Sequence, residues 1–127
     1  MGKSHADSIA SVNGGWLVAV ADGEAERLKA VREHLGQDIA VFEEYEAMLD
    51  SGGVDAVVVA TPHYQHPEMA IKAFAKGLHV LIEKPAGVYT KQVRQMNAAA
   101  EESGKVFGIM FNQRSVPAHQ KIKDLVD

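Results

Sequence analysis

The feature that most constrains the fold is an alternation of short apolar runs with longer amphipathic segments. Three of these runs are WLVAVA at 16–21, DAVVVA at 55–60 and HVLI at 79–82. Each run is short and flanked by turn residues, which is typical of a strand buried on both faces of a parallel sheet. The segments between the runs carry apolar residues at helical spacing. The alternation therefore predicts βαβ units in a doubly wound sheet, with helices on both sides.

Glycines and prolines at the ends of the segments set the predicted boundaries. We expect strands at 16–21, 39–42, 55–60, 79–82 and 106–111, and helices at 4–12, 24–35, 45–49, 67–75, 90–103 and 117–126. The first helix is expected to turn Ile9 and Val12 inward, and Thr90 to cap the helix that it begins. Five residues on core-like spacing receive no function: Trp16, Met48, Met69, Met96 and Met110.

The start of the sequence departs from the usual order of a dinucleotide-binding fold. Such folds begin with a strand, a glycine-rich turn and then a helix, whereas this sequence begins at the helix, with Gly2 as the remnant of the turn. The absent strand belongs at the sheet centre, between the strands at 16–21 and 55–60. We therefore predict an α/β, doubly wound (Rossmann-type) parallel sheet that lacks its first strand. Its unpaired strand edges favour association into a homo-oligomer.

Composition excludes several classes of function. The net charge is −4 and no basic stripe is present, so nucleic acid is not an expected partner. No apolar run reaches the roughly 18 residues that span a bilayer. The sequence contains no cysteine, which excludes disulfides, thiolate catalysis and cysteine-bound metal. With no signal-peptide pattern at the N-terminus, the sequence predicts a soluble cytoplasmic protein.

An acidic residue, Asp22, directly follows the first predicted strand. At the end of the second strand of a dinucleotide fold, a carboxylate accepts hydrogen bonds from the ribose hydroxyls of the adenosine. It also repels a 2′-phosphate, which favours NAD over NADP. The alternative is an aspartate that opens a turn with Gly23 or caps the following helix.

The segment after the strand at 55–60 is expected to meet a ligand. It contains Thr61, Pro62 and His66, and the order of a doubly wound sheet reverses beside this strand. Thr61 and the nearby backbone are candidates for cofactor contact, whereas His66 either caps the next helix or touches the cofactor. His63 and His66 lack a third ligand at a supporting spacing, so no metal site is expected.

Two further strand ends carry charged residues. Glu83, Lys84 and Pro85 follow the strand at 79–82, and Lys84 supplies a donor to a hydroxyl whose proton must leave as hydride departs. A salt bridge in a surface turn is the alternative role for this charged pair. Pro85 fixes the turn, with a cis bond as one way to do so. Arg114 follows the last strand on the same rim, where it either binds the cofactor or braces a domain interface.

Taken together, these pieces resemble the glucose-fructose oxidoreductase and inositol dehydrogenase (Gfo/Idh/MocA) family. The resemblance rests on VAVAD (18–22), VDAVVVATPHYQH (54–66), AIKAFAKGLHVLIEKP (70–85) and GIMFNQR (108–114), and it covers nearly the whole sequence. The spacing from ATP to EKP is its most specific element. Residues 1–5, MGKSH, look like the tail of the family's GxGxMGxxH segment. The family's first two glycines and its substrate domain are not present in residues 1–127.

The resemblance implies an NAD(P)-dependent oxidoreductase that moves a hydride between the cofactor, NAD being favoured, and a sugar, polyol or related small molecule. Residues 1–127 then form a partial dinucleotide-binding domain. Lys84 is implied as catalytic, and the implied cofactor-binding residues are Gly2, Asp22, Thr61, Pro62, His66, Glu83, Lys84, Pro85 and Arg114. The alternatives are a non-catalytic module that binds a nucleotide or a protein, and a structural fragment that assembles by strand exchange. The oxidoreductase hypothesis requires that Asp22, Thr61 and Lys84 lie in one crevice.

Overall fold

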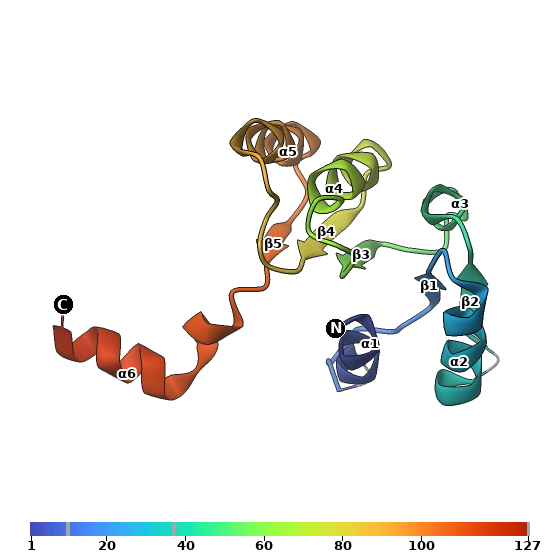
Figure 1. The fold of residues 1–127 in the computed structure, drawn as a ribbon, viewed down its shortest axis with the longest axis horizontal. Coiled ribbons are helices and arrows are strands. Elements are labelled where there is room, and N and C mark those ends of the chain that lie inside the picture. Colours follow the sequence, from blue (N-terminus) through green and yellow to red (C-terminus); the bar gives the residue numbers. More distant parts are fainter. Residues whose placement is uncertain (10, 37, 127) are drawn as a thin grey trace.

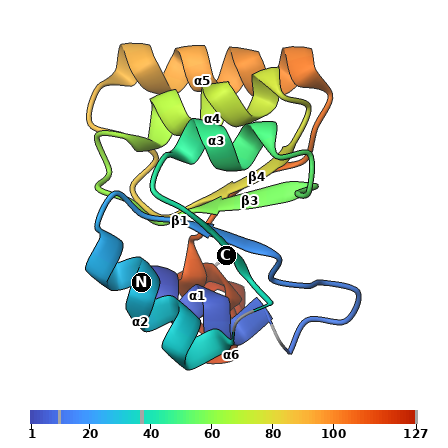
Figure 2. The ribbon, with the colours of Figure 1, turned by 90° about the vertical axis from the view of Figure 1, so that its right-hand side faces the viewer.

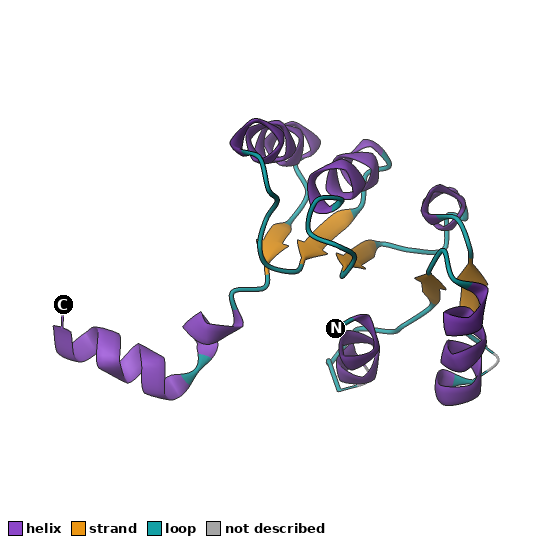
Figure 3. Ribbon diagram, viewed as in Figure 1, coloured by secondary structure: helices purple, strands orange, loops and turns teal. Residues whose placement is uncertain are grey.

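The computed structural model describes residues 1–9, 11–36 and 38–126, and its helices and strands alternate as the sequence predicts. The strands are β1 (Ala19–Ala21), β2 (Ala40–Phe42), β3 (Ala56–Val59), β4 (His79–Ile82) and β5 (Phe107–Ile109) (Figures 1 and 3). The helices are α1 (Gly2–Ile9), α2 (Ala25–Leu35), α3 (Tyr45–Asp50), α4 (His66–Ala75), α5 (Thr90–Ser103), the short 3₁₀ helix η1 (Asn112–Ser115) and α6 (Pro117–Val126).

Helices lie on both sides of the strands, which confirms the doubly wound arrangement. Figure 2 shows α3, α4 and α5 in one layer above the strands, and α1, α2 and α6 below them. All strand pairs that form are parallel. Right-handed βαβ connections between parallel strands place successive helices in this way.

The strands form two separate sheets rather than one. One sheet has the order β1–β2 and the other β3–β4–β5, and the described strands include no pairing of β1 with β3. This division falls where the sequence predicts a missing strand. Helix α1 lies below the space between β1 and β3 and contacts β3 (Figure 1). A Cβ at Gly2 would lie 3.9 Å from that of Ala60, so the start of α1 adjoins the end of β3.

The hydrophobic core is centred on the three-stranded sheet and the helices α4 and α5. Val57 and Val59 of β3 and Val80 and Ile82 of β4 are buried against this helix layer. Phe74 of α4 meets Phe107 edge to face, with ring centroids 5.5 Å apart. Alternate residues of a strand point to opposite faces, so these buried side chains recur at every second position.

Several predicted boundaries and burials are wrong around the two-stranded sheet. The predicted strand at 16–21 shrinks to Ala19–Ala21, and the side chain of Trp16 is not in the core but 79% exposed. A strand paired along one edge only has fewer neighbours to cover its side chains. Helix α1 ends at Ile9 rather than at residue 12, and Val12 points to solvent. Ala10, inside the predicted helix, lies outside the described residues.

Other corrections concern a cap and the outer face of the larger sheet. Tyr89 occupies the N-cap of α5, so Thr90 does not cap it, and no side-chain hydrogen bond is made there. The strand predicted at 106–111 is shortened to Phe107–Ile109. Ala56 and Val58 are exposed on the face of β3 opposite the core, so this strand is not buried on both faces.

Among the described residues, no helix is long and apolar enough to cross a membrane.

Candidate functional site

The residues singled out from the sequence follow the carboxyl ends of the parallel strands. Asp22 follows β1, Thr61 lies two residues beyond β3, and Glu83 follows β4. Ligands of open α/β sheets bind at this edge, because the loops that leave parallel strands gather there. The predicted convergence can therefore be judged from the cavity and the hydrogen bonds at this edge.

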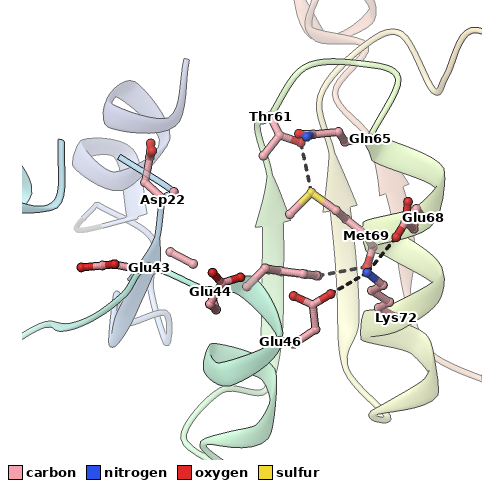
Figure 4. Close-up of a pocket in the computed structure, with 12 residues that line it drawn as sticks. Asp22, Glu43, Glu44, Glu46, Thr61, Gln65, Glu68, Met69 and Lys72 are labelled. Atoms are coloured by element: carbon pink, nitrogen blue, oxygen red, sulfur yellow. Dashed lines mark hydrogen bonds and ion pairs between the residues drawn. The ribbon is translucent and has the colours of Figure 1, made fainter. Parts of the chain in front are cut away.

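A cavity of about 280 Å³ joins the ends of β1 and β3. Both Asp22 and Thr61 line it (Figure 4). The other lining residues are Ala21, Gly23, Glu43, Glu44, Tyr45, Glu46, Gln65, Glu68, Met69 and Lys72. The cavity thus brings two of the three residues named in the convergence argument into one space, whereas Lys84 is outside its lining.

The carboxylate of Asp22 has a local partner at each of its oxygens. Its Oδ1 accepts the backbone N–H of Glu24 at 3.0 Å, and Glu24 is the N-cap residue of α2. Its Oδ2 lies 3.6 Å from the guanidinium of Arg27. The turn role considered as an alternative is therefore real. The turn uses only the Oδ1 oxygen of Asp22, and the side chain stays partly exposed beside the cavity.

The cavity wall is strongly acidic. Five carboxylates line it, from Asp22, Glu43, Glu44, Glu46 and Glu68, against one ammonium, that of Lys72. Lys72 is already engaged, because its Nζ lies 2.5 Å from Glu46 and 2.7 Å from Glu68 (Figure 4). Hydrogen bonds from Lys72 lower the pKa of Glu46, and the same contacts raise the pKa of Lys72. The wall therefore offers an anion no unpaired cation.

Neutral groups complete the wall on the α4 side. The hydroxyl of Tyr45 donates to the carbonyl oxygen of Met69 at 3.0 Å, and that of Thr61 reaches the Met69 sulfur at 3.2 Å. Burial raises the pKa of Tyr45, so its phenol keeps its proton. Met69 therefore links the segment after β3 to α3.

Glu83 is buried and doubly hydrogen-bonded. It is 5% exposed, and its Oε1 lies 2.6 Å from Nε2 of His5 on α1. Its Oε2 accepts the backbone N–H of Lys84 at 3.1 Å. Burial raises the pKa of Glu83, but the bonds from His5 and Lys84 together lower it more, so this pKa lies below its usual value. The carboxylate therefore stays charged at neutral pH.

His66 is buried beneath the loops. It begins α4 and is 1% exposed, with Nδ1 2.9 Å from the carbonyl oxygen of Pro85 and Nε2 2.8 Å from that of Thr61. Carbonyl oxygens only accept, so each bond needs an N–H, and an imidazole with one proton donates to one carbonyl at a time. The ring connects the segment after β3 to the segment after β4.

Comparison with known proteins agrees with this arrangement. Residues 1–111 match the model of the family described as "Oxidoreductase family, NAD-binding Rossmann fold" (GFO_IDH_MocA). The chain belongs to this family. It is 31% identical to scyllo-inositol 2-dehydrogenase (NAD(+)) of Bacillus subtilis, over 100% of this chain and 37% of that enzyme. It is 34% identical to D-glucoside 3-dehydrogenase of Escherichia coli, over 98% and 35% of the two chains.

Solved structures of other dehydrogenases share the fold. Myo-inositol 2-dehydrogenase from Lactobacillus plantarum has a TM-score of 0.91 and 29% identity, covering 99% of this chain and 38% of its own. The WlbA dehydrogenase from Bordetella pertussis, in complex with NADH and UDP-GlcNAcA, gives 0.91 and 29%, covering 98% and 38%. The chain thus spans little more than a third of the length of these relatives.

The remaining predicted site residues of this Gfo/Idh/MocA domain lie apart from the cavity. Lys84 and Pro85 are exposed, and the bond between them is cis, as one interpretation of the sequence allowed. Pro62 is exposed beside Thr61. Arg114 lies in η1, where its guanidinium stacks 5.3 Å from the ring centroid of Phe111, and no described contact joins it to the other candidates. Its predicted role stays a prediction.

Sequence reasoning missed two sets of residues at this site. It did not pair His5 with Glu83, which are 78 positions apart. The one available signal was the place of His5 in the tail of the GxGxMGxxH-like segment. It also missed the acidic wall from Glu43 to Glu46, although these residues directly follow β2, the neighbour of β1. Within the described ranges, no group of three or more metal-binding side chains occurs.

Proposed function

We propose that residues 1–127 form the cofactor-binding part of an NAD-dependent oxidoreductase that acts on a sugar, polyol or related compound. The proposal rests above all on the cavity that joins Asp22 to Thr61 at the carboxyl edge of the sheet. The family match supports the cofactor class. The relatives named above, dehydrogenases of an inositol and of a glucoside, support the substrate class.

The residues fit a dinucleotide in two places. Asp22 would accept hydrogen bonds from the ribose hydroxyls at the cavity. Thr61 and Pro62 would line the path of the cofactor from there past the end of β3. Gly2, at the start of α1 and beside Ala60, would lie near the pyrophosphate. We assign Glu83 and Pro85 to holding the turn around Lys84, and Arg114 to the rim. When bound, the nicotinamide supplies the hydride acceptor.

Lys84 is the residue that we assign to proton transfer. Its side chain is exposed, and within the described part of the chain no hydrogen bond or ion pair of its ammonium is found. Beside the cofactor, the Lys84 side chain can act as a proton relay: once its ammonium has released a proton to solvent, the amine accepts the proton of the substrate hydroxyl as hydride leaves for the nicotinamide. A change of Lys84→Ala in the complete enzyme should lower kcat much more than it raises the KM for NAD. Lys91→Ala, at the exposed start of α5, is the control.

The acidic wall favours NAD over NADP. A 2′-phosphate placed at Asp22 would face the five carboxylates, and the cations nearby, Arg27 and Lys72, are each held by two acids. Because the carboxylates at this wall outnumber the cations, an anion placed there is repelled at short range. We therefore assign NAD as the cofactor.

The deciding experiment is a titration of the isotope-labelled chain with NAD, followed by amide chemical shifts. We expect weak binding, because the chain carries one glycine of the phosphate-cradling fingerprint. Shifts should begin at Asp22, Gly23 and Thr61 and extend to Lys84. Shifts confined to other surfaces, or none at millimolar NAD, would contradict the proposal, and submicromolar affinity would contradict the expected weakness.

The divided sheet favours one other function, assembly through strand exchange. The facing edges of β1 and β3 make no pairing with each other, and such edges accept strands from other chains. Sedimentation of the chain over a range of concentrations tests this. A monomer at all concentrations would rule it out.

A further inference from the structure

The turn that contains Lys84 is held from two sides by histidines of other elements. His5 of α1 contacts the carboxylate of Glu83, directly before Lys84. His66 of α4 contacts the carbonyl of Pro85, directly after it. The two histidines come from opposite layers, because α1 lies below the strands and α4 above them (Figure 2). The turn is therefore fixed at both ends while its middle residue is exposed.

The contact of His5 extends through Glu83 to the backbone of Lys84. One oxygen of Glu83 lies 2.6 Å from the His5 ring, and the other accepts the amide N–H of Lys84. Two oxygens of one carboxylate thus fix both the direction of the Glu83 side chain and the amide plane that follows it. Charge-assisted hydrogen bonds of this kind are shorter and stronger than neutral ones.

The contact of His66 ties the same turn to the segment after β3. Its ring lies between the carbonyls of Thr61 and Pro85, at 2.8 and 2.9 Å. The chain beyond Pro85 also packs closely on the start of α4. A Cβ at Gly87 would lie 2.8 Å from Cγ of Pro67, so any larger residue there would force one of the two segments to shift. The spacing between the two segments is therefore set by buried contacts.

We propose that His5 and His66 are positioning residues for Lys84. The inference rests on the proposed function of Lys84 and assigns neither histidine to direct contact with cofactor. Both rings are occupied by the turn and its neighbours, and His66 has almost no exposed surface with which to touch a ligand. Holding the backbone on each side leaves only the side-chain rotations of Lys84 free. This lowers the conformational entropy that Lys84 must lose to reach a productive geometry.

Amide hydrogen exchange on residues 1–127 tests this positioning without any nucleotide. The variants are His5→Leu, which removes the donor, and His5→Gln, which keeps an N–H donor of similar reach. His66→Leu and His66→Gln form the second pair. The matched control is His34→Leu, since His34 makes a comparable 2.8 Å contact with Asp7 on the exposed surface.

We expect both leucine variants to speed exchange at the Lys84 amide roughly tenfold, because the turn opens locally. His5→Gln should restore most of the protection, and His66→Gln part of it, since a glutamine reaches one of the two carbonyls. Exchange at Val57 and Val80, inside the larger sheet, should stay unchanged in the glutamine variants and in the control.

Two results would overturn the proposal. Unchanged exchange at Lys84 in the leucine variants would show that the histidines do not hold the turn. Equal acceleration at Lys84, Val57 and Val80 in every variant, glutamine included, would show a general loss of stability instead of positioning. Neither result depends on nucleotide binding, so a failed NAD titration would remove the oxidoreductase proposal and leave this measurement to be judged by itself.

Discussion

The two sheets of the molecule differ in how well they are covered. In the three-stranded half (β3, β4, β5, α4 and α5), strand β4 has partners on both sides and its Val80 and Ile82 are buried. In the two-stranded half (β1, β2 and α2), every residue of β1 is only half-buried, and α2 buries a single side chain, Leu28. Sequences of similar apolarity thus reach different burial, because α4 and α5 cover one face of the three-stranded sheet, whereas α2 covers the two-stranded sheet with few apolar side chains.

Helix α3 connects the two halves. Its Met48 and Leu49 belong to the buried cluster of the three-stranded half, and the partly buried Ala19, Ala21 and Phe42 pack against that cluster. The candidate cavity lies along this connection, between the ends of β1 and β3. The comparison therefore concerns function as well as stability, since the site needs both halves at a fixed spacing.

The largest effect should come from the same substitution made in each half. Phe74→Ala in α4 removes a buried ring that meets Phe107, and we expect it to cost about 3–5 kcal/mol. Phe42→Ala in β2 removes a half-buried ring and should cost about 1–2 kcal/mol, since less area returns to water. Urea unfolding of both variants measures the two losses. Equal losses would show that the halves are equally packed.

Amide exchange should reveal the unpaired edges directly. In β3, the carbonyls of Asp55 and Val59 accept from β4 amides, so alternation turns the N–H groups of Ala56 and Val58 toward β1. We expect these two amides to exchange roughly 100-fold faster than those of Val57 and Val59. A synthetic apolar peptide that pairs at this edge should remove the difference. Equal rates along β3 without peptide would show that the edge is already paired.

The sequence was sufficient for the architecture because the pattern of local apolar runs determines strands and helices. The limits of β4, α5 and α6 agree with the structure to the residue. The burial of Trp16 was wrong because it assumed a strand with two partners, and partner number is a property of the whole sheet. The division itself was predictable, since it follows from the order of strands in a doubly wound fold.

The site was predictable only where it depends on topology. Asp22 and Thr61 share a cavity because parallel strands end at one edge, which sequence order alone implies. The bond from His5 to Glu83 spans 78 positions and depends on how α1 crosses the sheet, for which no local pattern exists. The role of His66 likewise depends on two backbone carbonyls, and backbone groups carry no sequence signal.

A smaller effect should follow from neutralising Glu83, whose contact with His5 ties α1 to the three-stranded half. The native pKa of Glu83 lies below that of an unfolded glutamate, about 4.3, so its contribution to stability is present above that pH. It is lost as pH falls through the native value. Glu83→Gln should therefore cost about 1–3 kcal/mol near pH 7, and this cost should shrink as the pH is lowered through the acidic range.

Thermal unfolding across this pH range, with Glu102→Gln on the exposed face of α5 as the control, measures the difference. A deficit of Glu83→Gln that did not shrink as the pH fell through the acid limb of unfolding would mean that its charge contributes nothing.

The smallest effect concerns cofactor choice, which the two-stranded half should control through Asp22. Asp22→Asn keeps an oxygen that can accept the Glu24 amide, so the start of α2 stays in place while one negative charge leaves the cavity. We expect the preference for NAD over NADP to fall roughly tenfold, because the removed charge is the repulsive element for a 2′-phosphate. Chemical-shift titrations with NAD and NADP give the ratio, and Asp50→Asn, an acid paired with Lys76 outside the cavity lining, is the control. If the ratio fell equally in both variants, overall charge would set the preference, and the acidic wall would have no specific part in it.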